Sequence, residues 1–85
     1  MYEARIEIPA EKFIERADKN LARRILDKIS ELRQNPFPRE TSKIKGLKED
    51  VYRVRVGKYR ILYAVFREQR LVVVVDIDKR GRVYE

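Results

Sequence analysis

The hydrophobic pattern of this sequence changes from a helical spacing after Asp18 to a period of two from Val51 onward, and this change limits the folds open to the chain. After Asp18, apolar residues recur at helical spacing, at Leu21, Ala22, Ile25, Leu26, Ile29 and Leu32. The spacing predicts a helix with one apolar face, which Asp18 caps and which Asn35-Pro36 ends. From Val51 onward the period is two, which is typical of β-strands. The chain therefore combines helices with strands.

The second half of the sequence predicts a run of strands joined by tight turns. Val51–Val56 and Tyr59–Phe66 alternate and are separated by Gly57-Lys58, which predicts a β-hairpin. After a turn at 67–70, residues 71–77 are apolar on both faces, so we expect this strand in a central or well-covered position. A turn at 78–81 then leaves residues 82–85 as a short tail strand.

The N-terminal part adds one strand and a short helix. Residues 2–8 alternate as in a half-buried strand. Pro9 suits the first turn of a helix, and Phe13, Ile14 and Ala17 form its apolar stripe. Residues 36–42, with two prolines, form a connector. The order β-α-α-β-β-β predicts a single α+β domain over residues 1–85, with two helices packed on one face of a mostly antiparallel sheet.

Composition excludes several kinds of chemistry. Cys and His are absent, which excludes disulfides, thiolate nucleophiles, Cys/His zinc sites and imidazole acid–base catalysis. The longest apolar run, 71–75, is too short for a membrane span, and the first residues lack a signal-peptide core, so we expect a cytoplasmic protein. A charged fraction of 41% with one Met resembles hyperthermophile composition, which indicates a thermophile source.

The charge is unevenly distributed along the chain. Residues 1–42 hold 9 basic and 8 acidic side chains, whereas residues 43–85 hold 12 basic and 6 acidic ones. A basic half on a small domain indicates an anionic partner, either nucleic acid or an acidic protein. The densest stretch runs from residue 43 to residue 60 and has seven basic residues: Lys43, Lys45, Lys48, Arg53, Arg55, Lys58 and Arg60.

Three arginines of this stretch are predicted to share the face that the helices leave open. Period two places the apolar residues of Val51–Val56 on one side and Arg53 with Arg55 on the other. Arg60, just past the hairpin turn, then lies close to Arg55. Such cations repel one another unless carboxylates or phosphates lie between them, and guanidinium groups bind phosphate with two parallel hydrogen bonds.

Four tyrosines are interleaved with these cations. Exposed tyrosines can stack on unpaired bases. Tyr52 and Tyr63 fit core positions with the hydroxyl reaching water, Tyr59 fits either role, and Tyr84 favours a functional one.

Several segments together resemble the RelE branch of the RelE/ParE toxin superfamily, over almost the whole chain. The segments are Lys43-Ile44-Lys45-Gly46-Leu47, the run from Tyr52 to Tyr63, Lys79-Arg80 and Val83-Tyr84. The resemblance implies a RelE-like fold and the toxin of a type II toxin–antitoxin pair. RelE-type members cleave mRNA in the ribosomal A site.

The resemblance also implies roles for particular residues. The implied catalytic residues are Arg53, Arg55, Arg60, Arg80 and Tyr84. The implied RNA- or ribosome-binding residues are Lys43, Lys45, Lys48, Lys58, Tyr59, Lys79 and Arg82. The reaction would be attack of a ribose 2′-OH on the adjacent phosphate, with no metal ion or cofactor. Because arginine cannot serve as a base, Tyr84 is the general-base candidate.

Two alternatives remain open from the sequence. One is a ParE-like toxin of the same fold that inhibits DNA gyrase by protein contact. The other is a noncatalytic RNA- or ribosome-binding module that uses the same basic face. Besides the ribosome and mRNA, the resemblance implies a cognate antitoxin as partner, and an acidic or amphipathic peptide would suit the basic face or the sheet edge.

Overall fold

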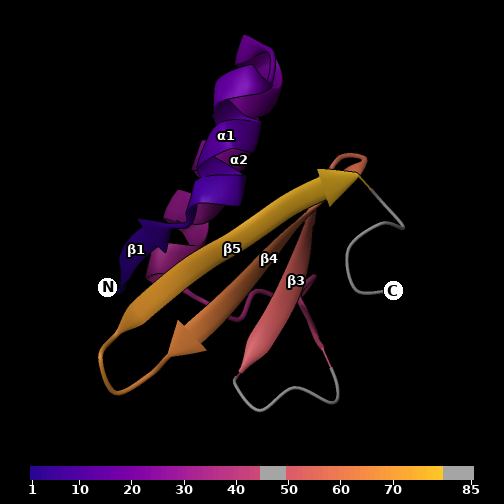
Figure 1. The fold of residues 1–85 in the computed structure, drawn as a ribbon. Coiled ribbons are helices and arrows are strands. Elements are labelled where there is room, and N and C mark those ends of the chain that lie inside the picture. The colour runs from indigo at the N-terminus through magenta and orange to yellow at the C-terminus, as the bar shows by residue number, and fades with distance from the viewer. Residues whose placement is uncertain (45–49, 80–85) are drawn as a thin grey trace.

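The computed structural model describes residues 1–44 and 50–79, which form an α+β fold. The elements are β1 (Glu3–Ile6), α1 (Ile8–Arg16), α2 (Lys19–Gln34), β2 (Ser42–Lys43), β3 (Val51–Val56), β4 (Tyr59–Phe66) and β5 (Leu71–Lys79). Both helices lie on one side of the sheet (Figure 1). The predicted order is confirmed with one addition, because Ser42 and Lys43 pair antiparallel with β3 as the short strand β2.

The five strands form one mixed sheet in the order β1-β5-β4-β3-β2. The parallel pairing is between β1 and β5, and the other three pairings are antiparallel. The central position expected for residues 71–77 is confirmed, since β5 lies between β1 and β4. The predicted turn at 78–81 begins too early, because β5 continues through Asp78 to Lys79. The predicted tail strand at 82–85 lies outside the described residues.

Local signals position both helices, but the strand expected over residues 2–8 is too long, because β1 ends at Ile6 and α1 begins at Ile8. The Leu21 N–H donates to Asp18 Oδ1 at 2.8 Å, which is the predicted N-cap of α2. Asn35 follows the last residue of α2, and Pro9 occupies the first turn of α1. These caps determine where each helix begins and ends, and so which side chains it turns toward the sheet.

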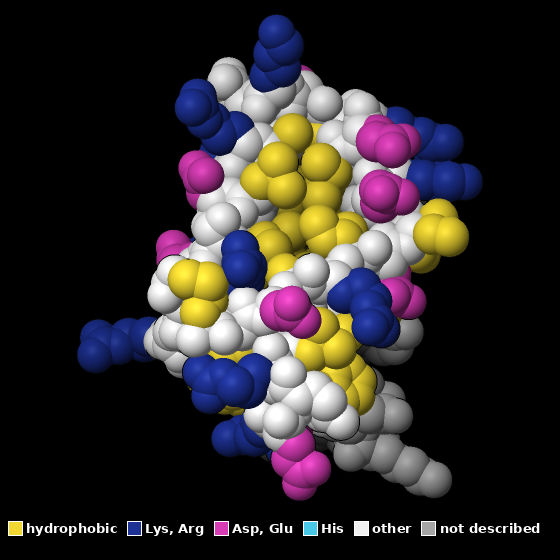
Figure 2. Space-filling view, turned by 90° about the vertical axis from the view of Figure 1, so that its left-hand side faces the viewer, with side chains coloured by type: hydrophobic (Ala, Val, Ile, Leu, Met, Phe, Trp, Pro, Cys, Tyr) yellow, Lys and Arg dark blue, Asp and Glu magenta, His cyan; other side chains and the backbone are white. Residues whose placement is uncertain are grey.

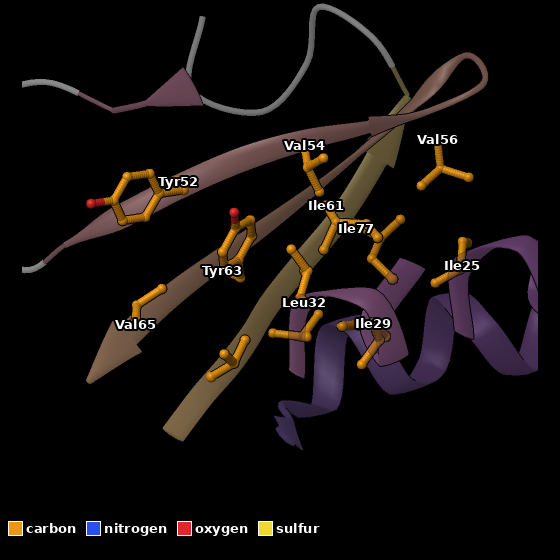
Figure 3. Close-up of a cluster of buried hydrophobic side chains, with 13 residues drawn as sticks. Ile25, Ile29, Leu32, Tyr52, Val54, Val56, Ile61, Tyr63, Val65 and Ile77 are labelled. Atoms are coloured by element: carbon orange, nitrogen blue, oxygen red, sulfur yellow. The ribbon is translucent and has the colours of Figure 1, made fainter. Parts of the chain in front are cut away.

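The core lies between α2 and the inner face of the sheet (Figure 3). Ile25, Ile29 and Leu32 of α2 are buried there against side chains from β3, β4 and β5. The expectation that Leu26 belongs to the same face is wrong, since Leu26 is 45% exposed. The helix meets the sheet along the stripe of Ile25, Ile29 and Leu32, and Leu26 falls about 100° around the axis from Ile25, outside that stripe.

A β-bulge in β5 changes which of its residues face the core. Tyr63 pairs with Val74, but the preceding residue, Leu62, pairs with Asp76, so Val75 is the extra residue. The Ile77 N–H donates to Asp76 Oδ1 at 2.8 Å in this irregular stretch. As a result Ile77 remains in the core, whereas Asp76 lies on the outer face with Leu62.

The outer face of the sheet has a small apolar cluster of its own. Val51, Leu62 and Ala64 are buried there, with Ile44 and Val75 packed around them. No helix in the described part of the chain is long and apolar enough to cross a membrane.

Candidate functional site

Arg53, Arg55 and Arg60 lie together on the outer face of the sheet, as period two predicts. Arg55 on β3 is directly opposite Arg60 on β4, and Arg53 is two residues from Arg55 along the same strand. Arg55 is exposed, and the other two are half-buried. Their neighbours Val54 and Val56 are buried in the core beneath, which keeps the arginines on the opposite side.

These three arginines line a shallow hollow of about 370 Å³, to which Glu40 and Ser42 also contribute. The carboxylate of Glu40 is already bound, because Lys28 Nζ of α2 lies 2.6 Å from Glu40 Oε2. The hydrogen bond from Lys28 lowers the pKa of Glu40, so this carboxylate stays charged and paired with the helix. The hollow is therefore rich in guanidinium groups that can bind an anion.

Two aspartates on the same face were not expected from the sequence. Asp78 lies directly opposite Arg60, and Asp76 lies opposite Leu62. Strict alternation from Val72 and Val74 would turn both carboxylates toward the core, and the bulge at Val75 reverses this. A sequence signal existed, because Ile77 is out of phase with Val72 and Val74.

Buried tyrosines support the site from below. Tyr63 is fully buried, and its hydroxyl donates to the Pro36 carbonyl at 2.8 Å and contacts the Thr41 hydroxyl. Thr41 Oγ1 in turn donates to the backbone carbonyl of Arg53 at 3.1 Å, which ties the 36–41 connector to β3 at the arginine. Burial raises the pKa of Tyr63 to about 12.

Tyr52 also belongs to the core. Its ring is 7% exposed and stacks on Tyr63 with 5.8 Å between ring centroids. Its hydroxyl bonds the Arg67 guanidinium, which raises the pKa of Arg67. The core positions predicted for Tyr52 and Tyr63 are confirmed, so neither ring is available to stack on a base. The expectation that the Tyr63 hydroxyl reaches water is wrong, because that hydroxyl is buried against Pro36 and Thr41.

The remaining described residues of the predicted site are more scattered. Tyr59 packs edge-on against Phe13 of α1 with 5.4 Å between ring centroids, on the helix side of the sheet. Lys79 pairs with Tyr59 across β4 and β5, and Lys58 is exposed in the hairpin turn. Lys43 lies opposite Tyr52 and contacts Asp50 at 3.5 Å, away from the arginines.

The structure thus brings Arg53, Arg55 and Arg60 together, with Lys58 and Lys79 at the adjacent end of the sheet. It does not bring Lys43 or Tyr59 to that face. The remaining predicted residues lie outside the described ones: Lys45, Lys48, Arg80, Arg82 and Tyr84.

The side of the molecule that carries β1 and the helices has a different surface. Figure 2 shows hydrophobic side chains gathered there in a strip, with Lys or Arg and Asp or Glu side chains of both signs around it. Ile8 and Leu26, which are 65% and 45% exposed, are the large apolar residues of the two helices that face solvent. The arginine-lined hollow on the outer face is thus the better place for an anion.

Comparison with known proteins places the chain in a family. The sequence model described as the ParE toxin of the type II toxin–antitoxin system parDE matches residues 5–84. RelE1, a curated relative from Methanocaldococcus jannaschii, is 41% identical over 59 residues, which cover 67% of this chain and 66% of RelE1. The aligned part is thus slightly less than two thirds of that relative's length.

Solved structures agree with the fold. The toxin chain in the crystal structure of the archaeal RelE–RelB complex from Pyrococcus horikoshii is similar with a TM-score of 0.85 and 30% identity, covering 96% of this chain and 98% of that one. The intact RelBE toxin–antitoxin complex of Escherichia coli gives a TM-score of 0.81 at 23% identity, covering 96% and 100%.

Proposed function

Because the chain belongs to the RelE/ParE family of toxins from type II toxin–antitoxin systems, we propose that it is a ribosome-dependent endoribonuclease that cleaves mRNA in the A site. The observation that carries this proposal is the opposition of Arg55 and Arg60 across the β3–β4 hairpin, with Arg53 on the same face. Three guanidinium groups over one hollow suit a phosphate whose negative charge increases during the reaction.

The proposed reaction is an internal transfer at one phosphate. The 2′-OH of the ribose loses its proton, its oxygen forms a bond to the adjacent phosphorus, and the bond from phosphorus to the 5′ oxygen breaks. The products are a 2′,3′-cyclic phosphate and a 5′-hydroxyl end, and the leaving oxygen takes up a proton. The arginines neutralise the charge on the pentacoordinate phosphorus, with Arg80 as a further contributor.

A second group must move the protons, since arginine keeps its proton at neutral pH. Tyr84 is the proposed general base. Asp78 lies opposite Arg60 and is the described carboxylate nearest to that arginine along the sheet register. We assign it to balancing charge among the arginines when no RNA is bound.

The family match itself favours a second candidate, because the matching sequence model is that of the ParE toxins. In that case the basic face would contact DNA gyrase, and no RNA would be cut. Inhibition of supercoiling by the purified protein, with mRNA left intact on translating ribosomes, would select this candidate. A noncatalytic RNA-binding module would give intact mRNA and salt-sensitive binding without gyrase inhibition.

The proposed partner is a cognate antitoxin, in keeping with the relative from Pyrococcus horikoshii that was crystallised with RelB. A peptide with acidic side chains could occupy the arginine-lined hollow and so exclude mRNA. A small acidic open reading frame beside this gene, whose product binds the protein, would support this assignment.

Primer extension on mRNA in a translation reaction tests the proposal. The wild-type protein should produce cuts at A-site codons, and Arg60→Ala should reduce them at least about 100-fold, as removal of one transition-state donor does elsewhere. Arg5→Ala is the matched control, because Arg5 is exposed on the same face but at the β1 edge. Absence of cuts with wild type, or equal cutting by Arg60→Ala, would reject the proposal.

A further inference from the structure

Arg24 of α2 lies directly against the turn of the β3–β4 hairpin. A Cβ atom built on Gly57 would be 2.8 Å from Arg24 Nη2 and 3.2 Å from Nη1. A side chain at position 57 would therefore require the Arg24 guanidinium to move away from the turn. Gly57 also has a φ of +61°, a conformation that glycine adopts without strain. Glycine at this position thus allows both the turn and the approach of Arg24.

The packing of the core does not require Arg24. Its side chain is exposed and lies at the edge of the buried stripe of Ile25, Ile29 and Leu32, about 100° around the axis of α2 from Ile25. Among residues 1–44 and 50–79 it forms no ion pair, in contrast to Lys28 one turn further along the helix, which binds Glu31 and Glu40. The Arg24 guanidinium therefore lies over the backbone of the hairpin turn, and it has no acidic partner among the described residues.

The surroundings of Gly57 are cationic as well. A hollow of about 520 Å³ at this end of the sheet is lined by Arg55, Gly57, Lys58 and Lys79. In the described part of the chain none of its three cations forms an ion pair either. Like charges brought together in this way repel one another, and a bound anion relieves the repulsion.

The hollow joins the two faces of the sheet. Arg55 belongs to the outer face with Arg60, whereas Lys79 shares the helix-side face with Tyr59. Lys58 and Gly57 form the tip between these faces, and Arg24 reaches the same tip from α2. The positive charge therefore continues from the outer-face arginines around the end of the sheet to the helix. A chain of phosphates fits such a path better than a single small anion does.

We propose that Arg24 is an RNA phosphate-binding residue, held over Gly57 so that a single RNA strand entering the arginine-lined hollow continues around the hairpin tip. Arg24 contacts a phosphate other than the one that is cut, and it adds affinity for the RNA backbone without reading its sequence. The RNA strand is the substrate of the proposed function, on which this inference rests.

The salt dependence of RNA binding tests the assignment. The probe is a fluorescein-labelled, unstructured RNA with 2′-O-methyl groups, which cannot undergo cleavage through the 2′ oxygen, and binding is followed by anisotropy without ribosomes. One lost phosphate contact reduces the slope of log K against log salt by about 0.7 for a single strand. Arg24→Ala should show that reduction, and Arg24→Lys should keep the wild-type slope because the charge remains.

Arg23→Ala provides the matched control. Arg23 is also exposed on α2, so its replacement removes the same charge from the position directly before Arg24. It should leave the slope unchanged. An Arg24→Ala slope equal to that of wild type, or an equal reduction in Arg23→Ala, would overturn the assignment, as would a wild-type protein that does not bind the probe.

Gly57→Ala supplies an independent check through a double-mutant cycle. The new methyl group must displace the Arg24 guanidinium, so Gly57→Ala should weaken RNA binding when Arg24 is present and have little further effect in Arg24→Ala. Any backbone strain that Gly57→Ala causes at the turn is the same in the Arg24→Ala background as in wild type, so it cancels in the comparison of the two losses in affinity. Additive losses would show that Gly57 and Arg24 act separately and would contradict the proposal.

Failure of this inference and failure of the proposed function give different results. A protein whose RNA affinity depends on Arg24 but which leaves mRNA intact on translating ribosomes keeps the binding site and loses the nuclease assignment. A protein that cuts mRNA while Arg24→Ala keeps the full salt slope retains the nuclease assignment and loses the role of Arg24.

Discussion

Arg55 and Arg60 are cross-strand neighbours at the turn end of the β3–β4 hairpin, so two guanidinium groups occupy one paired position of the sheet. Like charges directly opposite each other in an antiparallel pair destabilise it, by up to about 1 kcal/mol relative to uncharged pairs. Arg53 on the same face adds to this repulsion. An arrangement that costs stability without packing the core is typical of a functional site.

Replacing Arg55 should therefore stabilise the fold and weaken the function. Threonine suits a strand and removes the charge, so we expect Arg55→Thr to raise the free energy of unfolding by about 0.2–1 kcal/mol. Urea denaturation measures this change, and mRNA cutting should fall in the same variant. Arg5→Thr, which lies opposite Val73 on the same face, should change neither property. A destabilised Arg55→Thr would show that this arginine supports the fold.

Asp78 allows a test in which a negative charge, instead of a positive one, is removed from the site. Because it lies opposite Arg60, its carboxylate competes with RNA phosphates for the arginines. Asp78→Asn should bind RNA more tightly at low salt, by severalfold, and should unfold at a lower urea concentration. Asp27→Asn, with the same charge change on an exposed position of α2, is the control. Weaker RNA binding by Asp78→Asn would mean that this aspartate holds Arg60 in its binding orientation.

Much of this site could be predicted because its signals are local. A period of two, together with a two-residue turn, determines that Arg53, Arg55 and Arg60 share a face, and the capping side chain of Asp18 identifies the start of α2. Neither conclusion needs information about distant parts of the chain. The same reasoning placed Tyr52 and Tyr63 in the core.

The features that escaped prediction depend on contacts between distant residues. The pairing of β1 with β5 and that of β2 with β3 join segments that carry no shared local signal. The approach of Arg24 to Gly57 depends on how α2 packs against the sheet. The exposure of Leu26 likewise follows from the width of the helix–sheet contact, since its spacing alone suits a buried position.

Tyr63 connects the site to the core, and its hydroxyl can be removed without changing the ring. Tyr63→Phe leaves the buried Pro36 carbonyl without its donor and removes a partner of Thr41. We expect a loss of about 1–3 kcal/mol in the free energy of unfolding, measured by urea denaturation. Mutation of Tyr2, a ring that packs near Arg70, to Phe should cost less. Equal losses in the two variants would contradict a special role for the Tyr63 hydroxyl.

The raised pKa of Tyr63 also predicts how stability changes at alkaline pH. The folded protein holds the proton up to a pKa of about 12, whereas the unfolded chain releases it near 10.0. Between these values the unfolded state binds fewer protons, so stability falls as pH rises through that window and is fully present below it. The difference in unfolding free energy between wild type and Tyr63→Phe should shrink by an amount on the order of 2 kcal/mol across the window. A constant difference would show that burial does not affect this titration.

Because Val75 is the extra residue of a bulge, we predict that deleting it keeps the strand pairing, whereas deleting a residue from an uninterrupted strand would not. Since Tyr63 pairs with Val74 and Leu62 with Asp76, deleting Val75 joins two residues that already pair with neighbours on β4. Ile77 should stay in the core and Asp78 should stay opposite Arg60, so the variant should fold cooperatively. It should lose only the packing of Val75, about 1–2 kcal/mol for a partly buried valine.

Deletion of Val54 is the matched control, because β3 has no bulge and the loss would turn Arg55 toward the core. Contacts between Cα protons of facing residues, observed by NMR, report the pairing directly. If the Val75 deletion unfolds the chain as the Val54 deletion does, the bulge is needed for its bend as well as for its extra residue.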